Sequence, residues 1–212
     1  MKVGTFVHTA VLEPDEVDKR YSVCPTRKGS ANYNRLVDAG IEPVTQSQWD
    51  QAMSMRDAVM NHPEAAWLLS NGKAEQSLWW DDEQFELRCK CRPDWWNDDI
   101  VIDLKTTQDA SPKGFASSVA KWRYHVQQMH YVAGTKAARF VFVVVEKEYP
   151  FNVGVYELDN EACGIGEELR QRDMNRIKTC KARNEWPGYS KEVSTLSLPY
   201  YATNIELSPD DF

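Results

Sequence analysis

Long hydrophobic runs are absent from this sequence. Hydrophobic residues make up 42% of its 212 positions, but no apolar stretch approaches the roughly 20 residues that a transmembrane helix needs. Met1 is followed by an amphipathic helical pattern, which differs from the charged and then apolar order of a signal peptide. Internal repeats and low-complexity linkers are missing as well. These absences exclude a membrane partner and predict one soluble, cytoplasmic domain over residues 1–212.

Cysteine is sparse and does not follow the spacing of a metal or disulfide framework. The five cysteines contain no Cys-x-x-Cys pair, and an odd number cannot form a complete set of disulfides. Cys89 and Cys91 share one face of an expected strand, but two thiols without further spaced partners are more often free cysteines than a zinc site. We therefore expect reduced thiols.

The chain also lacks the positive net charge that favours nucleic-acid binding. Its formal net charge is −7, whereas duplex binding draws affinity from Lys and Arg side chains that neutralise phosphates. Basic residues nevertheless gather in two places. Either solvated surface or DNA contact explains these groups, which are Arg170, Arg172, Arg176, Lys178, Lys181 and Arg183 in one and Arg20, Arg27 and Lys28 in the other.

Two carboxylates and a lysine stand where neighbouring strands are expected to bring them together. Residues 85–91 alternate like a half-buried strand, residues 100–106 form a β-branched run, and residues 95–99 suit a turn. If the chain folds back about residues 98 and 99, Asp94 lies opposite Asp103, with their Cβ atoms about 5 Å apart. Two like charges so placed repel each other. A cation is therefore expected between them.

The residues that follow Asp103 complete this predicted site. Lys105 lies on the same strand face as Asp103, and the backbone carbonyl of Leu104 is free to turn inward where the strand pairing ends. Carboxylate and carbonyl oxygens suit Mg²⁺, for which Mn²⁺ can substitute. Taken singly, each carboxylate reads as a solvated group near a turn and the lysine as a surface residue. Their joint spacing favours a metal site.

Helical and strand patterns alternate along the chain. A helix expected over residues 114–132 carries Gln127 and Tyr131 on one face, and it also carries Lys121 and Arg123, which either track a DNA backbone or are simply solvated. The alternation predicts an α/β fold with a mixed central sheet covered by helices on both faces. The other expected elements are helices over residues 2–12, 47–60 and 63–69, strands over 139–146 and 153–158, a long helix ending near residue 182, and an irregular C-terminal stretch.

Several short motifs, taken in their order, resemble a known nuclease family. Arg92-Pro93-Asp94 followed by Asp103-Leu104-Lys105 resembles the signature of PD-(D/E)XK nucleases, with Asp where many members have Glu. Gln127 and Tyr131 resemble the Q-x-x-x-Y helix of the RecB branch. Similarity to exonuclease VIII (the RecE nuclease domain) and to lambda-type phage alkaline exonucleases extends over nearly the whole chain, through residues 3–8, 12–14, 72–79, 185–189 and 198–199.

The resemblance implies a role for each matching residue. Mg²⁺ ligands would be Asp94, Asp103 and the Leu104 carbonyl, with His8 and Glu75 as further ligands on helices. Lys105 would position or deprotonate the attacking water, and Gln127 and Tyr131 would hold a phosphate or a bound water. Read without the resemblance, His8 is a core histidine and Glu75 a solvated helix end. Arg27 and Lys28 are candidates for binding a terminal 5′-phosphate.

The same resemblance implies the activity. We expect a restriction-endonuclease-like core forming a single exonuclease domain, which digests one strand of linear duplex DNA from its 5′ end to mononucleotides and leaves a 3′ tail for an annealing protein. It also implies a homotrimeric ring. Because the C-terminal cysteine cluster of some RecB-type relatives is missing, we expect no iron-sulfur cluster. Two alternatives remain: an endonuclease of the same superfamily, or a DNA-binding protein without catalysis.

Tryptophan is unusually frequent, with eight residues that include the pairs Trp79-Trp80 and Trp95-Trp96. Core packing accounts for any one of them. Base stacking or a subunit interface would account for the surplus.

Overall fold

A computed structural model describes residues 3–97 and 99–199 of this protein. The chain divides into two compact units, residues 1–178 and residues 179–212. The first unit contains the central sheet and the helices that pack on it. It holds all the residues of the predicted metal site.

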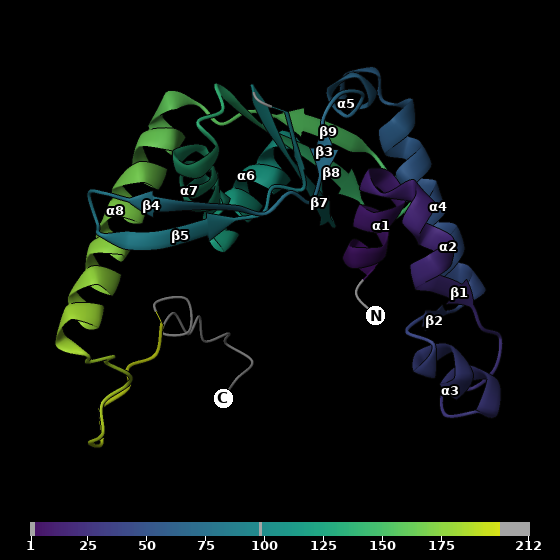
Figure 1. Ribbon diagram of the computed structural model, residues 1–212, viewed down its shortest axis with the longest axis horizontal. Coiled ribbons are helices and arrows are strands. Elements are labelled where there is room, and N and C mark those ends of the chain that lie inside the picture. Colours follow the sequence, from purple (N-terminus) through teal and green to yellow (C-terminus); the bar gives the residue numbers. More distant parts are fainter. Residues whose placement is uncertain (1–2, 98, 200–212) are drawn as a thin grey trace, which may run out of the picture. The chain divides into compact units, whose positions relative to one another are not determined.

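A five-stranded mixed sheet lies at the centre of the first unit (Figure 1). The strand order is β3-β6-β7-β8-β9, in which β7 and β8 run parallel and every other neighbouring pair is antiparallel. The predicted mixed sheet is thereby confirmed. Its strands are β3 (Lys73–Ala74), β6 (Trp95–Trp96), β7 (Ile100–Thr107), β8 (Arg139–Glu146) and β9 (Val153–Tyr156).

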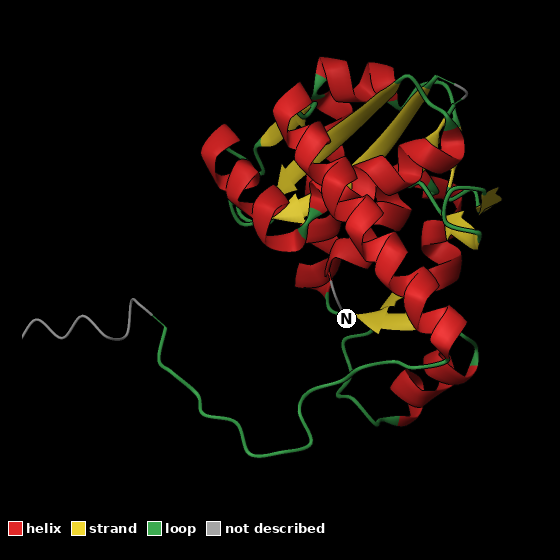
Figure 2. Ribbon diagram, turned by 90° about the vertical axis from the view of Figure 1, so that its left-hand side faces the viewer, coloured by secondary structure: helices red, strands yellow, loops and turns green. Residues whose placement is uncertain are grey.

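Each face of the sheet packs against its own helices. Ile102 and Leu104 of β7 point into one core, whereas Val101 points into the other, because successive strand residues face opposite sides. Figure 1 shows α1 and α4 on one side of the sheet and α6 and α7 on the other, and Figure 2 shows a layer of helices in front of the strands. These helices are α1 (Val3–Leu12), α4 (Gln46–Asn61), α6 (Pro112–Trp122) and α7 (Tyr124–Thr135).

Several elements begin and end close to where the sequence places them, and their capping residues explain this. Thr45 and Gln48 form a capping box at the start of α4, in which each side chain accepts a hydrogen bond from the other's backbone N–H. His62 accepts from the N–H of Ala65 and caps α5 (Pro63–Leu68). The strand expected over residues 139–146 coincides with β8, and the long last helix is α8 (Asn160–Arg183).

The single helix expected over residues 114–132 is instead two helices. Arg123 adopts a left-handed conformation (φ 60°, ψ 39°), which ends α6 and starts α7. The apolar periodicity continues across this residue, and arginine is not a residue that signals a break. The break gives α7, and with it Gln127, its own direction toward the sheet.

The strand expected over residues 85–91 does not pair with β7. It forms β5 (Leu87–Cys91), whose partner is β4 (Leu78–Asp82) in a separate antiparallel hairpin. The turn between them is fixed by Asp82, whose side chain accepts from the N–H of Phe85, and by Glu86 at φ 54°. The strand that pairs in antiparallel orientation with β7 is the short β6, at positions where the sequence predicts a turn.

The sequence gives no signal for a group of short elements near the N-terminus of the first unit. A 3₁₀ turn and a short helix follow α1, and two three-residue strands then pair in parallel around another helix. These elements are η1 (Pro14–Glu16), α2 (Val17–Arg20), β1 (Tyr21–Val23), α3 (Ala31–Asp38) and β2 (Glu42–Val44).

The second unit begins within the last turns of α8 and continues as irregular chain over the part that the structure describes, up to residue 199. Its large apolar side chains are exposed, as at Trp186 and Leu196. No described helix of either unit is both long and apolar enough to span a bilayer.

Candidate metal centre

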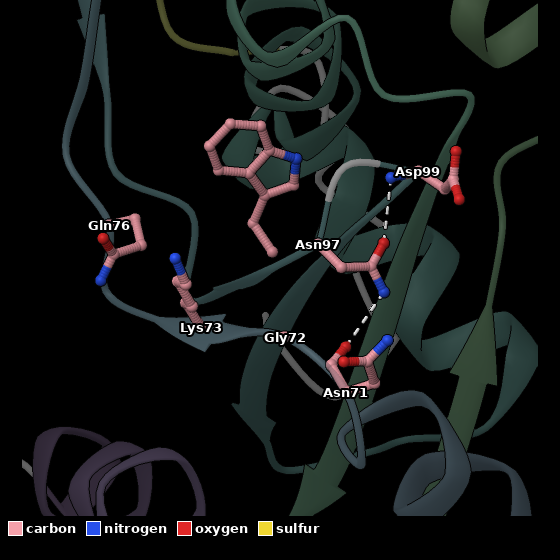
Figure 3. A pocket seen from close by; sticks show the side chains of 7 residues that line it. Asn71, Gly72, Lys73, Gln76, Asn97 and Asp99 are labelled. Atoms are coloured by element: carbon pink, nitrogen blue, oxygen red, sulfur yellow. Dashed lines mark hydrogen bonds between the residues drawn. The ribbon is translucent and has the colours of Figure 1, made fainter.

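A tight turn sets the register between β6 and β7. Asn97 Oδ1 accepts hydrogen bonds from the backbone N–H groups of Asp99 (3.0 Å) and Ile100 (2.9 Å), as Asx turns do. Its Nδ2 donates to the carbonyl of Asn71 at 3.0 Å (Figure 3). One side chain therefore ties the turn to the segment that leads into β3.

A polar pocket surrounds this turn (Figure 3). A Cβ on Gly72 would lie 2.3 Å from the indole Nε1 of Trp95, so the absence of a side chain lets β3 approach β6 closely. That approach places Glu75 beside Asp94, where the Glu75 N–H donates to the Asp94 carbonyl at 3.0 Å. The pocket is lined by Asn71, Gly72, Lys73, Gln76, Trp96, Asn97 and Asp99.

The register brings the two predicted carboxylates to neighbouring strands at one level. Trp95 pairs with Ile102, so the next position in the same register sets Asp94 opposite Asp103. Ladder pairing stops there, and Asp94 Oδ2 accepts from the N–H of Leu104 at 2.8 Å. Because the N–H and C=O of a strand residue point to the same side, the Leu104 carbonyl also faces this site. His8 contacts that carbonyl.

Three side chains from separate elements converge on one point. One ligand atom from each of His8, Glu75 and Asp94 lies within 4.8 Å of the others. His8 projects from α1, as expected, and its Nδ1 lies 3.7 Å from Asp94 Oδ2. Glu75 is not on a helix: it follows β3 in a left-handed conformation (φ 54°), and this backbone geometry turns its side chain toward the centre.

Asp103 and Lys105 form a second, adjoining group with Gln127 of α7. Asp103 is 1% exposed. Its Oδ1 accepts from Gln127 Nε2 at 2.6 Å, and its Oδ2 lies 2.5 Å from Lys105 Nζ. Lys105 Nζ also donates to Gln127 Oε1 at 3.2 Å. Tyr131, one turn along the helix, hydrogen-bonds to Gln127 and packs on the core, so it positions the amide.

Burial and like charge together make this centre electrostatically strained. Burial, followed by repulsion from Asp103, raises the pKa of Asp94 well above its usual range. Burial alone would lower the pKa of Lys105, but attraction and hydrogen bonding to Asp103 outweigh it and raise that pKa. Burial lowers the pKa of His8. At neutral pH the imidazole is therefore uncharged and Lys105 is a cation.

The donor set fits a divalent metal ion. His8 offers a neutral nitrogen, Glu75 and Asp94 offer carboxylate oxygens, and Leu104 offers a carbonyl oxygen. These are oxygen-rich ligands of the kind that Mg²⁺ and Mn²⁺ accept. Burial and then repulsion from Asp103 raise the pKa of Asp94, and a cation bound there would offset both effects.

The predicted DNA-contacting residues lie outside this cluster. Arg27 and Lys28 are exposed in the loop before α3, and Lys121 lies over the Trp122 ring on α6. Arg123 pairs with Asp173 at 2.5 Å. The basic group on α8 is not one solvated face: Arg170 is 7% exposed and is paired with Glu167 and Asp82.

Two residues of the centre were not assigned a role from the sequence. Arg92 Nε lies 2.6 Å from Glu75 Oε2, and Lys105 Nζ lies 4.5 Å from the centre of the Tyr124 ring. Arg92 directly precedes Pro93-Asp94, and strand alternation from residue 85 places it on the exposed face. That alternation was the available signal. Nothing in the sequence pattern distinguishes Tyr124 from core.

Comparison with known proteins gives a family and a fold. The model of the family described as "PDDEXK-like domain of unknown function (DUF3799)" matches residues 1–199. The crystal structure of a protein from Eubacterium rectale named "putative exonuclease" superposes with a TM-score of 0.65 at 13% identity, covering 97% of this chain and 79% of that one. A second structure, of a protein named SSO0001, has a TM-score of 0.35 at 16% identity and covers 61% of this chain and 60% of that one. No curated protein matches the sequence.

Proposed function

From the premise that this chain belongs to the family of PDDEXK-like domains, we propose that it is a Mg²⁺-dependent exonuclease acting on the ends of duplex DNA. The observation that carries the proposal is the placement of Asp94, Asp103 and Lys105 at the point where the pairing of β6 with β7 stops. His8 and Glu75 complete the cluster. Few chemistries other than phosphodiester hydrolysis use buried carboxylates, a neutral imidazole and a lysine at one point.

In this proposal the metal ion and the chain's own residues have different roles in catalysis. His8, Glu75, Asp94, Asp103 and the Leu104 carbonyl would hold divalent ions, which supply Lewis-acid stabilisation of the phosphoryl oxygens when bound. Asp94 is held by the Leu104 N–H. Asp103 is held by Gln127, which in turn is held by Tyr131. These fixed positions reduce the reorganisation that substrate binding requires.

Lys105 acts as a cation in this proposal and not as a base. Its pKa is raised through its contact with Asp103, so near neutral pH its ammonium has no free electron pair for accepting a proton from water. It can donate hydrogen bonds to the attacking water and to a non-bridging phosphate oxygen, and its charge opposes the negative charge that develops there. Tyr124 supports the ammonium from the face of its ring.

The direction and products of digestion rest on the resemblance to RecE-type and lambda-type exonucleases. We propose attack from the 5′ end, release of mononucleotides and a remaining 3′ single-stranded tail that serves an annealing protein. Arg27 and Lys28 would bind the terminal 5′-phosphate, and Lys121 and Arg123 would contact the duplex backbone. A homotrimeric ring belongs to the same proposal.

The decisive experiment incubates linear duplex DNA, with and without a 5′-phosphate, in Mg²⁺ and in EDTA. We expect mononucleotides and a 3′ overhang with Mg²⁺, preference for the phosphorylated end, and no digestion in EDTA. Covalently closed circular DNA serves as the matched control, because it has no ends. Nicked or linearised circles would replace the exonuclease by an endonuclease of the same superfamily.

A Lys105→Ala variant separates catalysis from DNA binding without catalysis. If its rate of digestion equals that of the wild type, the cluster is a remnant and the protein a DNA-binding module. Loss of digestion with retained DNA binding supports the proposal.

A further inference from the structure

The β4–β5 hairpin presents two chemically different faces. Leu87, Cys89 and Cys91 of β5 are buried, and the hairpin contacts α7 and Met174 of α8 through this side. The residues between them, Arg88 and Lys90, are exposed. The alternation of buried and exposed residues continues through Arg92, whose side chain is 59% exposed. Two cations on the solvent face of β5 and a third just beyond its end therefore follow one another.

A tryptophan accompanies these cations on the opposite strand. Trp79 of β4 pairs directly with Lys90 and is 55% exposed. Directly opposed residues of an antiparallel pair point to the same face, so the indole and the ammonium stand side by side in solvent. Within the described residues, the Lys90 ammonium makes no ion pair. The neighbouring Trp80 lies on the other face, where it is partly buried against the cluster that contains Leu87 and Cys89.

The row of cations ends at the metal centre. Arg92 Nε contacts Glu75 Oε2 at 2.6 Å, so the outermost ligand of the centre touches the first cation of the row. From Arg92 to Lys90 to Arg88 the strand advances about 7 Å per step, because antiparallel strands rise about 3.4 Å per residue.

We propose that the solvent face of the β4–β5 hairpin binds single-stranded DNA and leads that strand into the metal centre. Lys90 contacts a phosphate, Trp79, directly opposite Lys90, stacks on an unpaired base beside it, and Arg92 lies where the strand reaches the centre. This inference rests on the proposed nuclease function and adds the substrate's path. The surface combines cations with an exposed aromatic ring, which is how proteins bind unpaired strands without sequence preference.

The ion pairs on this face determine which of its cations are available to a phosphate. Arg88 is paired with Asp81 at 3.0 Å, and both side chains are largely exposed. Glu86, farther from the centre, pairs with Lys178. Arg92 is paired with Glu75 of the centre, so Lys90, which makes no ion pair among the described residues, carries the positive charge that is available to a phosphate. The proposed DNA path therefore lies at the end of the hairpin that adjoins the metal centre.

Binding of a fluorescein-labelled oligothymidylate in EDTA tests the path without catalysis. We expect Trp79→Ala to weaken binding by about fivefold or more, the range that stacking on one base provides. Trp79→Phe should restore most of the affinity, since the ring is kept. The matched control is Trp67→Ala, because Trp67 is 60% exposed but lies on α5, away from the hairpin. Equal effects of the two alanine variants would overturn the proposal.

The salt dependence of the same binding tests the phosphate contact. Lys90→Ala should reduce the slope of log affinity against log salt concentration by about 0.7, the contribution of one phosphate on a single strand. Trp79→Ala should leave this slope as in the wild type, since stacking releases no counterions. Lys113→Ala, at an exposed position on α6, is the control for loss of one positive charge. An unchanged slope in Lys90→Ala contradicts the proposal.

A comparison of two substrates separates failure of the path from failure of the nuclease function. The p-nitrophenyl ester of thymidine 5′-phosphate reaches the metal centre but is too short for the hairpin. We expect Trp79→Ala to lower kcat/KM for an oligonucleotide at least about fivefold more than for the ester. If the wild type hydrolyses neither substrate, the nuclease function fails. If it hydrolyses both and Trp79→Ala affects both equally, the path fails while the nuclease function stands.

Discussion

Two groups of buried charges in this protein differ in how they are balanced. Arg170 of α8 is 7% exposed, with its Nη1 3.3 Å from Asp82 Oδ2 and its Nε 2.8 Å from Glu167 Oε2. Burial would raise the pKa of Glu167, but the hydrogen bonds from Arg170 hold it below its usual value. This group supplies its own counterions, and such a group needs no ligand.

The candidate metal centre has more acidic groups than its own cations balance. Glu75, Asp94 and Asp103 lie together. Lys105 forms an ion pair with Asp103, and the exposed Arg92 forms one with Glu75. Asp94 has the N–H of Leu104 and a neutral His8 beside it, and its pKa is raised well above its usual range. The contrast teaches that burial of charge does not identify a site. The carboxylate whose charge the chain leaves unbalanced is what makes the second group a candidate site.

Substitution of Asp94 should have the largest effect on activity. Asp94→Asn keeps an oxygen for the Leu104 N–H but removes the charge that a divalent ion needs. We expect kcat/KM for DNA to fall by about a thousandfold or more, since a metal ligand supplies several kcal/mol of transition-state stabilisation. Steady-state digestion of linear duplex in Mg²⁺ measures this. Activity within about tenfold of the wild type would exclude Asp94 from the centre.

Substitution of Lys105 should have the second largest effect on activity. Lys105→Ala removes the cation that faces the developing phosphoryl charge, and we expect a loss of about 100- to 1,000-fold in kcat. Lys105→Arg keeps the charge and should recover part of the rate. Fluorescence anisotropy with duplex DNA in Ca²⁺ checks that binding persists. A Lys105→Arg variant as inactive as Lys105→Ala would indicate that charge alone is not what the site requires.

A substitution in the charge-balanced group around Arg170 should change the stability of the protein and not its catalytic rate. Arg170→Met leaves Asp82 and Glu167 without their partner in a partly buried place, and we expect a loss of about 3 kcal/mol in the free energy of unfolding. Urea denaturation in EDTA provides the value. The kcat of the protein that remains folded should stay close to that of the wild type. A large fall in kcat would mean that the two charge groups are coupled.

The pH dependence of stability should reveal the unbalanced carboxylate in the absence of metal. The raised pKa of Asp94 means that the folded protein binds this proton more tightly than the unfolded chain does. Ionising Asp94 therefore costs stability, and the cost grows as pH rises from the unfolded pKa, about 4, toward the folded pKa. Asp94→Asn lacks this cost.

The measurement is the difference in free energy of unfolding between Asp94→Asn and the wild type, in EDTA. We expect the difference to grow in favour of the variant as pH rises above about 4 toward the folded pKa of Asp94. Saturating Mg²⁺ should stabilise only the wild type. A difference independent of pH would show that Asp94 is not strained.

The fold was largely predictable because its elements follow regular periodicities. The β-branched run of β8 and the capped helix α4 have boundaries that local chemistry determines. The break at Arg123 was not predictable, because the backbone turns left-handed at a residue that carries no signal for it. The partner of β5 was also unpredictable. Pairing depends on contacts distant in sequence, and two strands of similar pattern compete for it.

The residues of the candidate site could be named from the sequence, but the contacts that hold them in place could not. The spacing between Asp94 and Asp103 corresponds to the observed register, and Gln127 does reach Asp103. The left-handed backbone at Glu75 and the ion pair from Arg92 depend on the close approach of β3 to β6. The absence of a side chain at Gly72 permits that approach. Such packing is set by side chains from several elements, and no local pattern encodes it.

Electron paramagnetic resonance of Mn²⁺ is the most direct test of the claim that the chain's unbalanced carboxylates hold a divalent ion. Titrated at mildly alkaline pH, the wild type should take up at least one equivalent of Mn²⁺ that Mg²⁺ displaces, whereas Asp94→Asn should take up far less and Arg170→Met as much as the wild type. Equal uptake by the wild type and Asp94→Asn would contradict the account.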